Sequence, residues 1–139
     1  MGVLGSFVLY HTQLELKHFL PAISIGLFSI AVLNLNNMRD WENDKASGKN
    51  TLVVKIGLTK AKKYHSLILI KGMFCTIFFI VNEEFKIIKL LFLFSFFPLI
   101  KHLVRFSSIK NPKGFDPELK KVALSTFLYS VLFLLSSSL

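Results

Sequence analysis

The sequence is short of cysteine, of acidic side chains and of charge in general. Its single cysteine, Cys75, can form neither a disulfide framework nor a cysteine zinc site. Only 8 acidic residues stand against 17 Lys and Arg, and charged residues make up 18% of the 139 positions. The chain also contains no internal repeat and no Pro-rich or Gly-rich linker. These absences exclude a disulfide-stapled scaffold and a repeat array, and they favour one apolar domain over residues 1–139.

What the sequence has instead is apolar length. Hydrophobic residues make up 53% of the chain, and the mean hydropathy of +0.56 is too high for a soluble domain of this size. Four apolar runs approach the ~20 residues that cross a bilayer as a helix. A span must satisfy its own backbone hydrogen bonds, so helices are expected rather than strands. We therefore predict an all-α integral membrane protein, a transmembrane helical bundle with spans at about residues 19–38, 64–81, 87–104 and 119–136.

A fifth apolar run, residues 3–10, is too short to cross a membrane. It has no basic segment before it and no small-residue cleavage site after it, so it is not typical of a signal peptide. We interpret it as a partial first span, the end of a longer helix. This interpretation predicts that the chain is the C-terminal part of a larger protein.

The formal charge of +9 is distributed unevenly. Seven Lys or Arg lie in residues 39–63 and five in residues 105–121, whereas residues 12–17 and 82–86 carry one each. This alternation follows the positive-inside rule, so the two basic segments are predicted to be cytoplasmic and the C-terminus external. No aromatic residues interleave with the basic ones as in a nucleic-acid surface, so a lipid bilayer is the expected partner and nucleic acid is not.

Several residues mark expected helix ends. Gly48 is expected to end the helix that carries the aspartates, and Thr59 to be the N-cap of the next long helix. Asp116, followed by Pro117 and Glu118, is typical of a helix start. Residues 50–58 have mild strand character, but without a partner strand we expect a short helix or an ordered loop.

The candidate chemistry lies in the stretch NLNNMRDWENDKASGKNTL, residues 34–52. If the first long helix continues through it, Asn36, Asp40 and Asp44 fall four residues apart on one stripe, with Asn37 beside them. Two carboxylates one turn apart repel each other unless a cation lies between them. Oxygen ligands of this kind suit a hard ion, Mg²⁺ first, rather than zinc or copper.

Basic residues accompany these acids. Mg²⁺ usually bridges one or two carboxylates to phosphate oxygens, and Arg39, Lys45 and Lys49 lie close in sequence to Asp40 and Asp44. Acids and bases together predict a diphosphate site. The alternative is a solvated helix end, whose acidic and basic residues merely pair with each other.

The same stretch resembles the second aspartate-rich motif of the UbiA-type intramembrane prenyltransferases, and within them most resembles the 1,4-dihydroxy-2-naphthoate polyprenyltransferases of menaquinone synthesis. The family pattern N-N-x-R-D-x-x-x-D-x-x-x-G-K-x-T-L is matched in order by Asn36, Asn37, Arg39, Asp40, Asp44, Gly48, Lys49, Thr51 and Leu52. The segment from Asp116, DPELKKVALSTFLYSVLF, is similar to the start of the subfamily's last helix. The resemblance implies the C-terminal half of a nine-helix bundle.

The resemblance also implies residue roles. Asp40 and Asp44 would be catalytic Mg²⁺ ligands, and Arg39 and Lys49 would neutralise the diphosphate of a polyprenyl diphosphate donor. Asn36 and Asn37 would orient ligands or substrate, and Lys45 is a weaker diphosphate candidate.

The first motif of the family, N-D-x-x-D-x-x-x-D, is not in the sequence, and Glu83 and Glu84 are predicted to lie on the other side of the membrane. A separate N-terminal half is therefore an expected partner. The acceptor implied is dihydroxynaphthoate; another aromatic acceptor, or a non-catalytic membrane fragment, is the alternative.

Two histidines, His65 and His102, fall near span ends on the predicted cytoplasmic side. Nothing at metal-ligand spacing accompanies either of them, so they are interpreted as ordinary interfacial residues. The fifteen phenylalanines are interpreted chiefly as lipid-facing or helix-packing residues, with an isoprenoid tunnel as the alternative.

Overall fold

The computed structural model describes residues 19–82 and 87–138, and all regular structure within these ranges is helical. The elements are α2 (Phe19–Arg39), α3 (Trp41–Ala46), α4 (Leu52–Ile56), α5 (Leu58–Val81), η2 (Ile87–Ser95), α6 (Phe96–Phe106), η3 (Pro112–Phe115) and α7 (Asp116–Ser138). The expected all-α class is confirmed. The partial span predicted at residues 3–10, and Glu83 and Glu84, lie outside the described residues.

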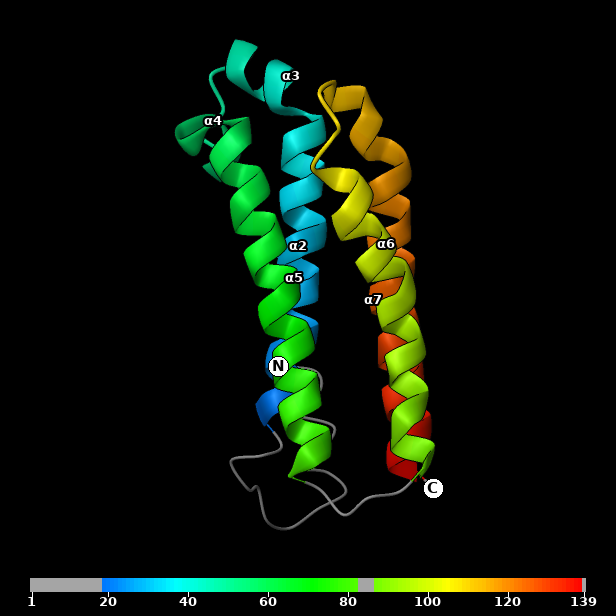
Figure 1. Cartoon of the computed structure of the whole chain (residues 1–139). Helices are drawn as coiled ribbons and strands as arrows, with labels where there is room; N and C mark the ends of the chain where they lie inside the picture. Colours follow the sequence, from blue (N-terminus) through cyan, green and yellow to red (C-terminus); the bar gives the residue numbers. More distant parts are fainter. Residues whose placement is uncertain (1–18, 83–86, 139) are drawn as a thin grey trace.

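The long helices form an elongated antiparallel bundle (Figure 1). Helix α5 runs beside α2, and α7 runs beside η2 and α6, which follow each other without a break. The short elements α3, α4 and η3 gather at one end, where α2 ends and α5 and α7 begin. Both basic segments therefore lie at the same end of the bundle, as the positive-inside pattern requires.

The outside of the bundle is apolar. Helices α2 and α5 are each long and apolar enough to cross a membrane; the other two predicted spans correspond to η2 with α6, and to α7. Large apolar side chains point outward from all four long segments, among them Leu33, Phe74, Phe78, Phe97, Val104, Leu124 and Phe127. Such surfaces are suited to lipid rather than to water.

The contact between α2 and α5 depends on a glycine. The buried ring of Phe28 on α2 lies so close to Gly72 on α5 that a Cβ there would be 2.6 Å from Phe28 Cε1. Phe28 in turn makes edge contacts with Tyr129 at 5.3 Å and Phe96 at 6.4 Å between ring centroids. Small residues let membrane helices approach closely, because packing rather than the hydrophobic effect drives their association.

A buried polar group joins three helices in the middle of the bundle. Thr76 Oγ1 on α5 lies 3.0 Å from Ser24 Oγ on α2 and 2.9 Å from Tyr129 Oη on α7. In an apolar surrounding, such hydrogen bonds favour association between helices. The helix that leads to the candidate site, α2, is thus held from two sides.

The helix ends mostly follow the sequence signals. Gly48 has φ 72° just after α3, and residues 52–56 form the short helix α4, so both expectations are confirmed. The prediction for Thr59 is wrong, because α5 begins at Leu58 with Gly57 at its N-cap. Gly57 has φ 79°, a conformation that glycine adopts without strain, so α5 begins two residues earlier than expected.

Candidate functional site

The candidate site lies where α2 meets α3, and the helix is interrupted there. The expected continuous helix through Asp40 and Asp44 is wrong: α2 ends at Arg39, and α3 begins at Trp41. Asp40 between them has φ −90° and ψ 5°, and its side chain does not cap α3. The carboxylate instead pairs with Arg39, which explains why the usual N-cap hydrogen bond is not made.

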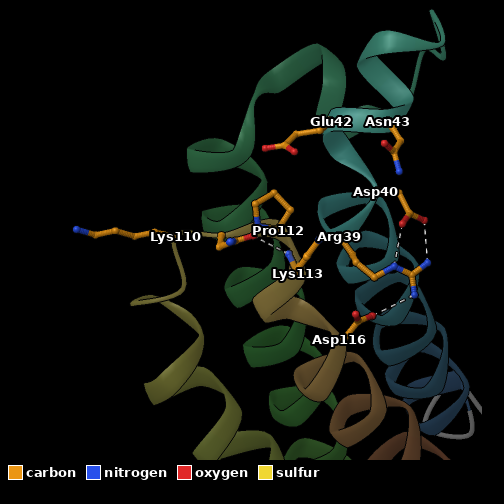
Figure 2. A pocket seen from close by; sticks show the side chains of 9 residues that line it. Arg39, Asp40, Glu42, Asn43, Lys110, Pro112, Lys113 and Asp116 are labelled. Atoms are coloured by element: carbon orange, nitrogen blue, oxygen red, sulfur yellow. Dashed lines mark hydrogen bonds and ion pairs between the residues drawn. The ribbon is translucent and has the colours of Figure 1, made fainter.

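Arg39 is held between two carboxylates (Figure 2). Its Nε and one terminal nitrogen each donate to Asp40 at 2.8 Å, and its other terminal nitrogen lies 3.5 Å from Asp116 Oδ1. The hydrogen bonds from Arg39 hold the pKa of the Asp40 carboxyl below its usual value, although partial burial acts in the opposite direction. The fork geometry leaves Arg39 pre-oriented at the bundle end.

These three residues line a pocket of about 660 Å³ between α2, α3 and the segment before α7. The remaining lining residues are Glu42, Asn43, Lys110, Asn111, Pro112 and Lys113. In Figure 2, Lys110 points away from the carboxylates. The pocket therefore combines acidic and basic side chains, the composition predicted for a metal and diphosphate site, but it draws several of them from residues 110–116.

The second aspartate of the motif has a different environment. Asp44 is 5% exposed, is not among the residues that line the pocket, and pairs with Lys49 at 3.1 Å between Oδ1 and Nζ. Lys45 lies over the Trp41 ring, 5.6 Å from its centroid. The predicted stripe is therefore divided between an open pocket at Asp40 and a covered ion pair at Asp44.

The predicted amides Asn36 and Asn37 are half-buried on the last turn of α2, before Arg39. A neighbouring amide that sequence reasoning missed, Asn34, is buried and donates from Nδ2 to the carbonyl of Ala61 at 3.1 Å. The sequence contains a signal for it, since Asn34 stands in an apolar helix two residues before Asn36, the first residue of the motif. Its role is to hold α2 against α5.

The loop that closes the pocket is held by Lys62 of α5. Its ammonium group donates to the carbonyls of Ser107, at 3.4 Å, and Ile109, both of which follow the last residue of α6. It also lies 5.9 Å and 5.8 Å from the ring centroids of Phe106 and Phe115. A cation near a helix C-terminus is favourable, so Lys62 fixes the segment that carries Lys110 and Lys113.

The donors present fit Mg²⁺ only in part. Asp40 offers a carboxylate at the pocket, and Mg²⁺ typically takes one or two carboxylates and completes its shell with water and phosphate oxygens. Within residues 19–82 and 87–138 no three His, Cys, Asp or Glu side chains come together as a metal site. This arrangement suits an ion that arrives with a diphosphate rather than one held by protein alone.

Two pocket features went unnoticed in the sequence. The sequence indicates Asp116 only as a helix start, and Lys110 and Lys113 only as positive-inside charges. They come from residues 110–116, more than seventy positions after Arg39. No local pattern indicates that pairing; the resemblance of the segment from Asp116 was the one available hint.

Comparison with known proteins identifies the family. The description "UbiA prenyltransferase family" matches residues 1–135. The chain belongs to this family. It is 34% identical over 133 residues to 1,4-dihydroxy-2-naphthoate octaprenyltransferase of Haemophilus influenzae, covering 96% of this chain and 43% of that protein. It is 33% identical over 135 residues to the protein of the same name of Escherichia coli, covering 97% and 44%. No solved structure gives a significant match.

The resemblance stated from the motif is thereby confirmed at the level of the family. The chain spans less than half the length of the curated relatives that it matches. Membership and the apolar surfaces of α2 and α5 agree that this is an integral membrane protein.

Proposed function

We propose that this chain supplies the second aspartate-rich half of a Mg²⁺-dependent prenyltransferase, which moves a polyprenyl group from polyprenyl diphosphate to 1,4-dihydroxy-2-naphthoate. The observation that carries the proposal is the Arg39–Asp40–Asp116 cluster in a pocket at the basic end of a membrane bundle. The names of both curated relatives support the choice of acceptor. The site would face the cytoplasm from the cell membrane, in accordance with the positive-inside pattern.

In this proposal the residues divide between metal and diphosphate. Asp40 would hold Mg²⁺ at the pocket, and Asp44, which pairs with Lys49 in this structure, would be the second carboxylate available to the ion. Arg39 and Lys49 then stabilise the negative charge that gathers on diphosphate as the allylic carbon–oxygen bond breaks and its electron pair leaves with the oxygen. Mg²⁺, when bound, supplies further stabilisation of the leaving diphosphate. Asn36, Asn37 and Lys45 are the flanking candidates for contacts with the diphosphate.

The acceptor ring attacks the allylic cation, and in the naphthoate reaction the attacked carbon loses its carboxylate as CO₂. The first aspartate-rich motif would come from a separate N-terminal half. A different aromatic acceptor, or a non-catalytic membrane fragment, is the competing outcome. The second of these is favoured by the lack of the family's first motif, N-D-x-x-D-x-x-x-D, in the sequence.

The test begins with binding. In calorimetry, the purified chain in lipid nanodiscs should bind inorganic diphosphate only when Mg²⁺ is present. Asp40→Asn should abolish this Mg²⁺-dependent binding. Lys55→Gln is the matched control, because Lys55 is exposed on α4 and does not line the pocket. Binding that ignores both Mg²⁺ and Asp40 would contradict the proposal.

Transfer is tested separately. Membranes that contain this chain and a segment with the first motif should convert dihydroxynaphthoate and octaprenyl diphosphate to the prenylated product, detected by mass spectrometry. Asp40→Asn should lower the rate by about 100-fold or more, the loss typical of removing a group that stabilises transition-state charge. Diphosphate binding without transfer would favour the non-catalytic alternative.

A further inference from the structure

A buried hydrogen-bonded chain links three helices just below the pocket. His65 Nε2 on α5 lies 2.9 Å from His102 Nε2 on α6, and His102 Nδ1 lies 2.7 Å from Glu118 Oε2 on α7. The other carboxylate oxygen of Glu118 accepts from Lys121 Nζ at 2.6 Å. His65 and His102 are 0% exposed and Glu118 is 1% exposed. The proposed reaction uses none of these four residues.

The chemistry of the chain sets its direction. A charged Glu118 accepts a hydrogen bond from His102 Nδ1–H, so a neutral His102 has a bare Nε2. His65 Nε2 then donates to His102 Nε2. Each carboxylate oxygen of Glu118 has a partner: Oε2 pairs with His102 of α6, and Oε1 pairs with Lys121 of its own helix. The side chain of Glu118 is therefore fixed in one orientation.

Glu118 stands two residues after Asp116 in the first turn of α7. Side chains two apart on a helix point in directions that differ by about 200°. Glu118 is buried against α6, while the carboxylate of Asp116 is 56% exposed at the pocket and lies 3.5 Å from Arg39. Rotation of this turn would move both together, so an anchor on Glu118 also sets the position of Asp116.

We propose that the His65–His102–Glu118 chain is a positioning device that locks the rotation of the first turn of α7 and so holds Asp116 against Arg39. The relevance of Arg39 to diphosphate rests on the proposed function; the lock itself does not. Loss of the chain frees the turn, and Arg39 then pairs with Asp40 alone and is no longer held toward the middle of the pocket.

The experiment measures the position of α7 directly. Spin labels at Ser47→Cys and Lys120→Cys, in a Cys75→Ser background, report the distance between the end of α3 and the first turns of α7 by electron-electron resonance in nanodiscs. Ser47 and Lys120 are exposed and lie outside the pocket lining. The parent chain should give one narrow distance distribution, and Glu118→Leu should give a broad or shifted one.

Two variants separate positioning from plain stability. Glu118→Gln keeps the shape of the side chain, and its amide can donate to His102 while accepting from Lys121, so this variant should keep the narrow distance distribution of the parent. Thr76→Val removes a buried polar tie elsewhere in the bundle; it should lower the unfolding temperature but leave the distribution narrow. An unchanged distribution in Glu118→Leu, or equal broadening in Thr76→Val, would overturn the proposal.

If Glu118→Leu does not fold, His65→Phe/His102→Phe removes the chain while filling its space, and the same broadening is expected. In a second arm, Mg²⁺ with inorganic diphosphate is titrated into the parent and into Glu118→Leu, for which affinity should fall about tenfold, as expected when a binding group is misplaced. Equal affinities would limit the lock to structure and overturn its link to Arg39. A parent that binds no diphosphate refutes the proposed function, while the distance measurement still decides whether the lock exists.

Discussion

Replacing Gly72 with alanine tests the packing that places α2, and with it the candidate site. The new methyl group would lie 2.6 Å from Phe28 Cε1 and 3.0 Å from Cδ1. Carbon atoms in contact normally lie about 3.5–4.0 Å apart, so the ring or one of the helices must move by about 1 Å. The Phe28 ring has little room to move, because it is buried and the rings of Tyr129 and Phe96 pack against it.

The magnitude follows from two opposing effects. Overpacking of this kind costs about 1–3 kcal/mol, while alanine improves on glycine inside a helix by about 1 kcal/mol. Gly72→Ala should therefore lower the free energy of unfolding by roughly 0–2 kcal/mol relative to the parent chain, and by about 1–3 kcal/mol relative to a helical Gly→Ala change that meets no neighbour. Thermal unfolding in detergent, followed by circular dichroism, will show the second difference as several degrees in the unfolding temperature.

The control and the rescue come from the same helix pair. Gly26→Ala on α2 meets nothing within 4 Å and should leave stability unchanged or slightly improved. Phe28→Leu should recover part of the loss when combined with Gly72→Ala, with a coupling of about 1 kcal/mol in the double-mutant cycle. If Gly72→Ala is as stable as Gly26→Ala, the close approach of α2 and α5 is refuted.

The remaining predictions concern the two ion pairs of the motif. Lys49→Met leaves the buried Asp44 carboxylate without its cation and should lower the free energy of unfolding by about 1 kcal/mol, a modest loss because Lys49 itself is 68% exposed. Denaturant unfolding should show partial recovery of stability in Lys49→Met/Asp44→Asn. Equal stability of Lys49→Met and Lys55→Met would contradict the pairing. For Asp40, the lowered pKa means that the Arg39 pair stabilises the folded chain above the unfolded carboxyl pKa of about 3.9, and that this stability is lost as pH falls through the lower folded value. Arg39→Gln should flatten that part of the curve of unfolding free energy against pH, and an unflattened curve would count against the pair.

The fold could largely be predicted because the membrane limits the possibilities. Long apolar runs must be helical, and the charge pattern places successive loops on alternate sides. Helix starts were harder. Thr59 has the side chain of an N-cap, but the positive φ available to Gly57 let α5 begin earlier.

The site was only partly predictable. Asp40 and Arg39 were found from their pattern, yet the helix break between α2 and α3 was not, because the competing partner for Asp40 is its own neighbour Arg39 rather than the α3 backbone. Asp116 and the histidine pair depend on contacts across the bundle. His65 and His102 are 37 residues apart, and no periodicity within either helix indicates that they meet.

The paired charges at the pocket also bear on how the proposed site would work. Arg39 and Asp40 neutralise each other, and so do Lys49 and Asp44. Binding of Mg²⁺ with diphosphate would let each cation turn to a phosphate oxygen and each carboxylate turn to the metal, so opposite charges remain paired throughout. An exchange of partners avoids leaving a lone charge at the membrane border, which would cost about 1 kcal/mol for pairs as exposed as these. It follows that either component alone should bind weakly, since Mg²⁺ without diphosphate leaves Arg39 and Lys49 unpaired, and diphosphate without Mg²⁺ leaves Asp40 and Asp44 unpaired.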